Sequence, residues 1–554
     1  MYLLFEEQDY PIEVFQRLRL REFYRQASPT TARFNYIGFF KSFEKDTSVS
    51  VFTLPKIFLH DGKVFGKYDL LAFATKPSRH VLNPREYDII RGLIEKLYFC
   101  LRQYQKETNS DSIESAFGYS IKSNIGNNDV GSFEAMLGLI AFNRSNPYLL
   151  VQHKEISISQ NPKYTNWKKT LSTSLPINYN NSPLYLDLSG GIRKNKRTDP
   201  LLMIYYSLLN EFKQYDPTIN IDASVDILPS GKLSRLKTKI TLFLRTSKSL
   251  YFSDKFKQLH SLLYSYYFAN KANYKNERIE FLLTDDFDRV FEKIVDTLLS
   301  DEYLLAQYKY LKDGKEIDHL FGEADVFRGN KIIYIGDSKY YKDPRRITFQ
   351  RYKQFTYARN IIQENIYVLN SGGETIYSRN YRDDVSEGYN VTPNFFVIGT
   401  VNPNYLENGW LIEPDKLPPE FSFHFPNRLF DRDTLHVLYF NADFIRLVNF
   451  YIGKQKRLTF GRQTLRDRAR ETIQKQFSSY LENKYDFYEL NISAQFVENN
   501  FRILHGKVFT SPALFPRYLM ALERRFQDEN NSVLKLLHDS RVDFKPIQLQ
   551  SFSI

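Results

Sequence analysis

The sequence predicts a multidomain α/β protein with a β-rich amino-terminal region, an α/β core and a mainly helical carboxy-terminal region. Its 554 residues are too many for one ordinary domain of roughly 150 residues. Strand-like segments dominate the first 75 residues or so, helix and strand patterns alternate from 276 to 370, and helical patterns prevail after about 427. These changes place the expected domains at 1–80, 81–275, 276–405 and 406–554.

The elements are expected in the following order. Two strands come first, at 34–40 and 51–58, because β-branched and aromatic residues fill them and turn signals follow. A helix follows at 84–106, where apolar residues recur at helical spacing, and a loop rich in Ser, Asn and Gly at 107–131. Later elements are expected as helices at 133–142, 200–214, 253–270, 287–299 and 347–362, and as a strand at 391–401.

The composition excludes several protein classes. Gly (23) and Pro (22) are too few for a collagen-like or Pro/Gly-disordered chain. The single cysteine, Cys100, excludes an intrachain disulfide framework and a cysteine-based zinc site. The chain begins without a basic signal-peptide region and has no long apolar run, so we expect a cytoplasmic protein without a membrane partner. The net charge of +12 favours a polyanionic partner.

One stretch carries residues suited to phosphodiester chemistry. Asp325 ends a short segment, and twelve residues later a β-branched strand ends in Asp337-Ser338-Lys339. Because side chains alternate along a strand, Asp337 and Lys339 are expected on one face. The two carboxylates and the Ser338 carbonyl offer hard oxygen ligands for Mg²⁺ or Mn²⁺. Lys339 is placed to orient an attacking water and to stabilise the developing negative charge.

The helices expected on either side supply further polar groups. The 287–299 helix is strongly amphipathic, and Glu292 borders its apolar stripe as a further candidate acid. Asp288, Glu292 and Asp296 are spaced four residues apart and form one acidic ridge on this helix. In the alternative interpretation, the ridge simply faces water and Glu292 is not part of the site. On the 347–362 helix, Gln354 and Tyr357 share a face and are expected to support the site. His319 is expected to be structural or solvated rather than a metal ligand.

Basic residues near this stretch are candidates for phosphate contacts. The segment from Lys339 to Arg359 carries seven Lys or Arg residues against one acid. A second basic ridge, formed by Arg462, Arg466 and Arg470 at helical spacing, lies in the carboxy-terminal region. It is expected either to contact DNA phosphates or to form a solvated helix face. Trp167 is expected to be a buried structural residue rather than a base-stacking one. The candidate DNA-binding residues are Arg345, Arg346, Arg351, Arg462, Arg466 and Arg470.

These motifs together resemble the PD-(D/E)XK nuclease core, with Ala324-Asp325 in place of the pattern's Pro-Asp. Their details are similar to McrC-type restriction subunits and to the related LlaJI group of restriction endonucleases. The segments that carry the resemblance are Phe291-Glu292, Gly336-Asp337-Ser338-Lys339, 352–358, 166–170 and 428–435.

The resemblance implies a restriction-endonuclease-like α/β core and a metal-dependent DNA endonuclease of an anti-phage restriction system. It further implies double-stranded DNA as substrate, a separate AAA+ GTPase or ATPase partner similar to McrB, and a homodimer or higher assembly. The chain carries no P-loop of its own, because 226–234 lacks the first glycine and the Ser or Thr of that motif. The first 270 residues are therefore the expected docking region for the partner.

Two alternatives and one geometric problem stay open. The chain is alternatively a non-catalytic DNA-binding regulator of a partner motor, or a free-standing nuclease that acts on DNA or RNA. In a hairpin turning at Gly329-Asn330, Asp325 lies opposite Tyr334, roughly 10 Å short of Asp337 along the strand. A bulge or diverging strands would be needed to bring the two carboxylates together.

Overall fold

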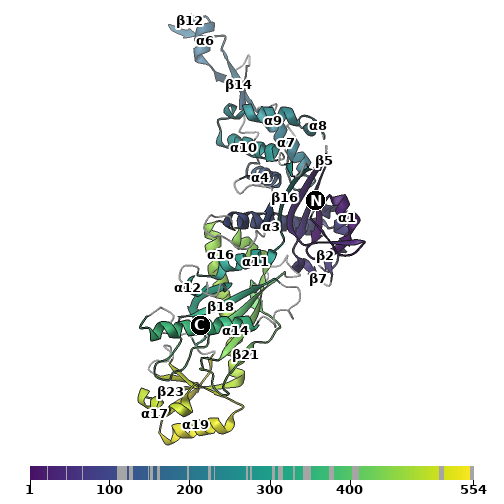
Figure 1. Ribbon diagram of the computed structural model, residues 1–554. Helices are drawn as coiled ribbons and strands as arrows, with labels where there is room; N and C mark the ends of the chain where they lie inside the picture. The colour runs from purple at the N-terminus through teal and green to yellow at the C-terminus, as the bar shows by residue number, and fades with distance from the viewer. Residues whose placement is uncertain are drawn as a thin grey trace.

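The protein is a mixed α/β molecule with several separate sheets, which confirms the expected class (Figure 1). No helix in the part of the computed structural model described here is long and apolar enough to cross a membrane. The structure describes residues 1–549 apart from 21–22, 45–46, 61, 65, 109–120, 124–128, 148, 150–153, 159–162, 196–198, 222–225, 230, 270–272, 275–276, 302–305, 310–315, 328–330, 341–350, 374–379, 402–410 and 511–516.

The amino-terminal unit is built on a sheet of order β1-β6-β5-β16-β15, with β9 also paired to β16. Its last long strand, β16 (Glu277–Thr284), runs antiparallel to β5 with Phe281 opposite Phe40. Residues 277–284 thus belong to the amino-terminal sheet, and the expected domain boundary at 276 is wrong. The other strands are β1 (Tyr2–Phe5), β5 (Ile37–Glu44), β6 (Thr47–Leu54), β9 (Ile121–Ser123) and β15 (Asn273–Tyr274).

Alternation along β16 explains why this strand returns to the amino-terminal sheet. Ile279, Phe281 and Leu283 point into the core formed with α1 (Ile12–Leu18) and the small sheet β2-β4-β3. Leu282 points to the other face, into the core that contains α3 (Pro84–Thr108). The small sheet consists of β2 (Gln8–Pro11), β3 (Arg25–Gln26) and β4 (Thr31–Phe34).

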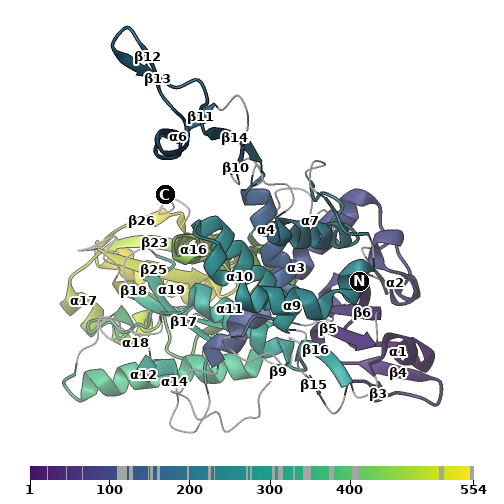
Figure 2. The same ribbon diagram turned by 90° about the horizontal axis from the view of Figure 1, so that it is seen from above.

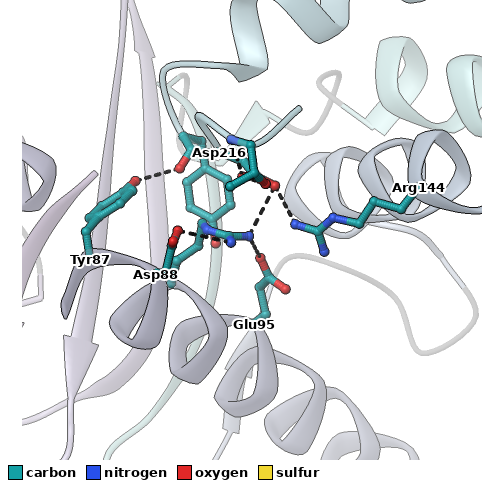
Figure 3. A network of polar contacts seen from close by, with 8 residues as sticks. Tyr87, Asp88, Glu95, Arg144 and Asp216 are labelled. Atoms are coloured by element: carbon teal, nitrogen blue, oxygen red, sulfur yellow. Dashed lines mark hydrogen bonds and ion pairs between the residues drawn. The ribbon is translucent and has the colours of Figure 1, made fainter. Parts of the chain in front are cut away.

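A helical cluster is inserted between β6 and β16, and it contains the helices expected at 133–142, 200–214 and 253–270. It comprises α4 (Ser132–Ser145), α7 (Pro200–Phe212), α9 (Lys237–Thr246) and α10 (Asp254–Ala269). A buried ionic network joins it to α3 (Figure 3). There Asp216, whose side chain is fully buried, accepts from Arg91 of α3 at 3.2 Å and also pairs with Arg144 of α4. Arg91 also contacts Glu95 at 3.1 Å and Asp88 at 3.4 Å, so three carboxylates surround this buried cation.

An arm projects from this cluster, away from the rest of the molecule (Figures 1 and 2). Its base is the pair β10 (Lys154–Ile158) and β14 (Gly190–Asn195), and β11 (Tyr164–Thr165) also pairs with β14. Its outer part holds α6 (Trp167–Thr173) and the hairpin β12 (Ile177–Tyr179)–β13 (Ser182–Leu184). Trp167 is 56% exposed, so its expectation as a buried residue is wrong. Other large apolar side chains exposed on the arm are Leu171, Leu175, Ile177, Tyr179, Leu184, Leu186 and Leu188.

The second unit is centred on a sheet of order β17-β18-β19-β22-β20, with β21 paired to β22. β17 and β18 form an antiparallel hairpin, whereas β18, β19 and β22 are parallel. The strands are β17 (His319–Ala324), β18 (Lys331–Lys339), β19 (Asn394–Thr400), β20 (Ile412–Pro414), β21 (Glu420–Ser422) and β22 (Leu435–Asp443).

Helices α11 (Phe287–Leu299) and α14 (Arg351–Asn370) cover opposite faces of this sheet. Phe291 of α11 packs on Gly399, where a Cβ would lie 2.7 Å from the ring. Phe355 of α14 packs instead with Phe396 and Ile398, whose side chains alternate with that of Gly399 along β19. The expected helix at 287–299 is confirmed, and the later one extends to Asn370.

The carboxy-terminal region is not mainly helical, contrary to expectation. After α15 (Phe444–Tyr451) and the long α16 (Gln455–Lys484), it forms an antiparallel sheet of order β24-β25-β23-β26. All six residues of β25 are buried, so this strand lacks the alternation by which strands are recognised. The elements are β23 (Tyr485–Asn491), α17 (Ala494–Asn499), α18 (Phe501–Leu504), β24 (Val508–Thr510), β25 (Tyr518–Glu523), α19 (Gln527–Asp539) and β26 (Asp543–Ile547).

Candidate active site

Two carboxyl groups face each other at the end of the β17–β18 hairpin. His319 pairs with Gly336, so the preceding Asp318 lies across from Asp337. The two side chains share a hydrogen bond, and burial together with the Asp337 charge raises the pKa of Asp318 well above its ordinary value. The proton of the pair is therefore held more firmly than by an isolated carboxyl, because two adjacent carboxyls do not readily ionise together.

The chemistry of this pair fits a divalent cation. Asp337 is fully buried, and the Asp318 side chain is 12% exposed. Within the described residues, Oδ2 of each carboxyl has no hydrogen-bond donor. No group of three His, Cys, Asp or Glu side chains in that part of the chain could hold a metal, so the pair would leave several positions for water. That is the usual arrangement for Mg²⁺, which binds one or two carboxylates and keeps much of its hydration shell.

Lys339 lies on the same face of β18 as Asp337, as predicted. Its Nζ donates to Asp337 Oδ1 at 2.5 Å, and its side chain is only 8% exposed. Burial alone would lower the pKa of Lys339, but the charges of Asp337 and Asp318 raise it, so the amine stays charged. Burial alone would raise the pKa of Asp337, but the hydrogen bond with Asp318 and the charge of Lys339 lower it.

Ser338 points to the opposite face, towards α11, because side chains alternate along β18. The residue is 3% exposed, and its Oγ has no hydrogen-bond partner among the described residues. The role of its main-chain carbonyl as a metal ligand stays a prediction. Gly336 shares this face, and a Cβ there would lie 2.6 Å from the Phe395 ring, so only glycine allows this packing.

Helix α14 adds a second cation that the sequence reasoning missed. Lys353 Nζ lies 4.0 Å from Asp318 Oδ1 and 5.3 Å from the centre of the Tyr357 ring. Burial would lower the pKa of Lys353, but Asp337 and Asp318 raise it. Its position four residues before Tyr357, on the helix already assigned to the site, is the signal that could have identified it.

Gln354 and Tyr357 lie on the same helix, as expected, and both are buried. Neither Oε1 nor Nε2 of Gln354 has a hydrogen-bond partner in the part of the chain that the structure describes. A buried amide without partners costs about 1–3 kcal/mol, so a partner for Gln354 is expected, and its supporting role at the site stays a prediction. Tyr357 donates to the main-chain oxygen of Glu316 at 3.1 Å and so ties α14 to the segment before Asp318.

Helix α11 contributes Glu292. Burial raises the pKa of Glu292 to about 7, the Lys339 charge opposes this shift, and the Asp337 charge adds to it. The acid ridge on α11 is not a solvated face. Asp296 is buried and accepts from Lys309 Nζ at 2.6 Å, with His319 Nδ1 at 3.5 Å. His319 is thus a buried structural residue, as expected, and belongs to the opposite face from Asp337.

Asp325 lies at the other end of the hairpin, so its expected place beside Asp337 is wrong. Ala324 pairs with Lys331, six residues before Asp337, which corresponds to roughly 20 Å along the strand. Asp325 is buried there and accepts from Asn390 Nδ2 at 2.6 Å. Each β17 residue pairs with a β18 residue four positions earlier than a turn at Gly329-Asn330 would give, and this register brings Asp318, not Asp325, to the site.

The predicted phosphate ridge on α16 has a structural role instead. Arg466 donates to the carbonyls of Leu299 and Ser300 at 2.8 and 2.6 Å and pairs with Asp301 at 2.6 Å. Arg462 also donates to Ser300 O, and Arg470 pairs with Glu323. The guanidinium groups of Arg462 and Arg466 satisfy carbonyls at the carboxyl end of α11, where positive charge is favoured.

The remaining predicted phosphate contacts are Arg351, Arg345 and Arg346. Arg351 pairs with Glu420 and lies over the Tyr352 ring at 5.0 Å, and its side chain is 36% exposed. A phosphate contact by Arg351 stays a prediction. Arg345 and Arg346 lie outside the described residues.

Comparisons of the chain with protein-family models, curated proteins and solved structures found no match. The chemistry assigned to the site therefore rests on its own residues and geometry.

Proposed function

We propose that the chain is a metal-dependent DNA endonuclease of a restriction or anti-phage system, with a PD-(D/E)XK-type site. The observation that carries the proposal is the buried Asp318–Asp337 pair with Lys339 beside it. A strand hairpin followed by parallel strands, between α11 and α14, supports the PD-(D/E)XK assignment. The cytoplasm is the proposed location, since such a system acts on DNA that has entered the cell.

Each side chain has a distinct task in this proposal. Asp318 and Asp337 would hold Mg²⁺ or Mn²⁺, and Glu292 would add negative charge beside the site without being a third ligand. The bound ion would polarise the scissile phosphate and lower the pKa of a water molecule. Lys339 orients the attacking water, and Lys353 offers positive charge to the phosphate as negative charge develops. Attack in line with the leaving oxygen gives a 5′-phosphate and a 3′-hydroxyl.

The direct test is cleavage of supercoiled plasmid DNA by the purified protein, alone and with its NTPase partner. Mg²⁺ or Mn²⁺ should support nicking or cutting, and chelation should stop it. Asp337→Ala and Lys339→Ala should abolish cleavage while the circular dichroism spectrum stays unchanged. Full activity of Asp337→Ala would contradict the site assignment.

The two alternatives make different predictions in the same assay. A non-catalytic regulator would bind DNA without cutting it, and the complete Asp318, Asp337 and Lys339 set argues against that reading. A nuclease directed at RNA would use the same residues, so parallel reactions with RNA and DNA distinguish the substrate. Double-stranded DNA is the proposed substrate because of the resemblance to restriction subunits.

A separate AAA+ GTPase or ATPase is the proposed partner, and the arm supplies a surface for it. Leu175 is 90% exposed and Tyr179 is 65% exposed, although apolar side chains on a free surface are normally scattered singly. The amino-terminal unit also contacts the catalytic strand, since Tyr340 donates to Glu6 Oε2 at 2.8 Å. A partner bound to the first 270 residues would thus be connected to the residue that follows Lys339.

A further inference from the structure

The solvent face of α16 carries two adjoining hollows that the catalytic site does not use. One, of about 630 Å³, lies between α15, α16 and β20 and is lined by Arg446, Arg457 and Phe460. The other, of about 670 Å³, lies further along α16 and is lined by Lys475 and Tyr480. Arg468 lines both, so the two hollows form one groove.

The charge of this groove is positive. Arg446, Arg457, Arg468 and Lys475 line it, and Glu471 is the acid among the lining residues. Glu471 pairs with Arg468 at 3.2 Å. No ion pair joins Arg446 or Arg457 to a described residue, but Asp443 lies near Arg446: burial raises the pKa of Asp443, and the charge of Arg446 opposes this shift. Burial lowers the pKa of the nearby Lys96, and the Arg457 charge lowers it further, which is the response expected where cations crowd together.

The spacing of the cations suits an extended polyanion. Arg457, Arg468 and Lys475 are separated by 11 and 7 residues, which is about three and two turns of helix, so they share one side of α16. They span 18 residues, about 27 Å, which matches about eight nucleotides of one strand at 3.4 Å each. This side faces away from Arg466, whose guanidinium is directed at α11.

An exposed aromatic ring lies at one end of the groove. Phe460 is 65% exposed, and its ring meets Phe450 edge to face with centroids 6.4 Å apart. The large exposed fraction makes the Phe460 side chain accessible to a base. Stacking requires an unpaired base, because the bases of a duplex are stacked on one another.

From these observations we infer that the solvent face of α16 binds single-stranded DNA, with phosphates at Arg446, Arg457, Arg468 and Lys475 and a base on Phe460. The identity of the nucleic acid as DNA rests on the proposed function. A nuclease that acts with a motor would use such a groove to hold a strand away from the site of cleavage.

The test is fluorescence polarisation with a labelled single-stranded oligonucleotide of about ten nucleotides, slightly longer than the groove. The full-length protein is used with a chelator present, so that binding is measured without metal or cleavage. The variants are Arg457→Glu with Arg468→Glu, and Phe460→Ala. Lys535→Glu, an exposed lysine on α19, is the matched control for the change of charge.

The double variant should bind at least tenfold more weakly, and the slope of log affinity against log salt should fall by about 1.4, which is 0.7 for each lost contact. Phe460→Ala should bind about tenfold more weakly with an unchanged salt slope, because stacking is not ionic. Lys535→Glu should bind like the wild type, and all variants should keep the wild-type melting temperature, since the altered side chains are exposed.

Unchanged binding by the double variant would overturn the proposal that this groove binds single-stranded DNA. Equal competition by duplex DNA, together with no effect of Phe460→Ala, would overturn the single-strand assignment. This binding test is independent of the proposed catalysis. A protein that binds in this way but never cleaves DNA with Mg²⁺ would contradict the proposed nuclease activity, while DNA binding by the groove would still hold.

Discussion

Asp318 lies directly across the β17–β18 hairpin from Asp337, and the two carboxyl groups share a hydrogen bond. Both are largely buried, and Lys339 and Lys353 provide the two neighbouring positive charges. Burial and the Asp337 charge raise the pKa of Asp318, so binding of a divalent cation would compete with its proton, because metal ligands must be deprotonated. The behaviour of the site should therefore depend on pH, on metal and on the two lysines.

Stability of the metal-free protein should fall as pH rises through the range set by Glu292. The pKa of this group is raised from 4.5 to about 7 in the folded protein, so the folded state holds a proton that the unfolded state has lost. The stabilisation from that proton is complete below about pH 4.5 and is lost as pH approaches 7. Glu292→Gln should remove this dependence.

The measurement is the melting temperature of wild type and Glu292→Gln in chelator at pH 5 and pH 8. The melting temperature of Glu292→Gln minus that of wild type should be larger at pH 8 than at pH 5. Adding Mg²⁺ at pH 8 should stabilise the wild type. Parallel pH curves for the two proteins would show that Glu292 does not titrate in this range.

Lys353 should set the pH at which the site becomes active. Its charge lowers the pKa of Asp337, Asp318 and Glu292, so Lys353→Met should raise all three. The pH–rate profile for plasmid cleavage should move upward, and a shift of one unit corresponds to about a tenfold loss on the acid side. Lys353→Arg is the control that keeps the charge. Superimposable pH–rate profiles for Lys353→Met and wild type would exclude this role of Lys353.

Part of this arrangement could be predicted from the sequence and part could not. Asp337 and Lys339 were found because two residues along a strand always share a face. Asp318 was missed because the register of a hairpin depends on its turn, and the turn position was assumed to be symmetric. The role of Arg466 was missed for a related reason, since helical spacing shows which residues share a face but not what that face contacts.

Arg466 should matter for stability rather than for DNA. Its loss leaves the Leu299 carbonyl and the Asp301 carboxylate without this donor, while the Ser300 carbonyl keeps its hydrogen bond from Arg462, at a cost on the order of 2 kcal/mol. Arg466→Ala should lower the melting temperature and leave the salt dependence of DNA binding unchanged. Arg468→Ala, two residues away with a 64% exposed side chain, should melt like the wild type. A normal melting temperature for Arg466→Ala would contradict the structural role.

The arm should be needed for the partner and not for the fold. Leu175 and Tyr179 are exposed, so replacing both by Ser should leave the melting temperature and the partner-free nuclease activity unchanged. Stimulation of cleavage by the AAA+ NTPase should be lost, because the exposed apolar surface is the proposed contact. Stimulation of the double variant to the wild-type level would show that the partner binds elsewhere.

We propose that Asp318 and Asp337, and not Asp325, form the metal site. The decisive measurement is calorimetric titration of Mn²⁺ into wild type, Asp318→Asn and Asp325→Asn. We expect wild type and Asp325→Asn to bind Mn²⁺ and release protons. Asp318→Asn should lose at least tenfold in affinity, the scale on which metal sites respond to altered ligands and their partners. Unimpaired binding by Asp318→Asn, or loss of binding by a folded Asp325→Asn, would contradict it.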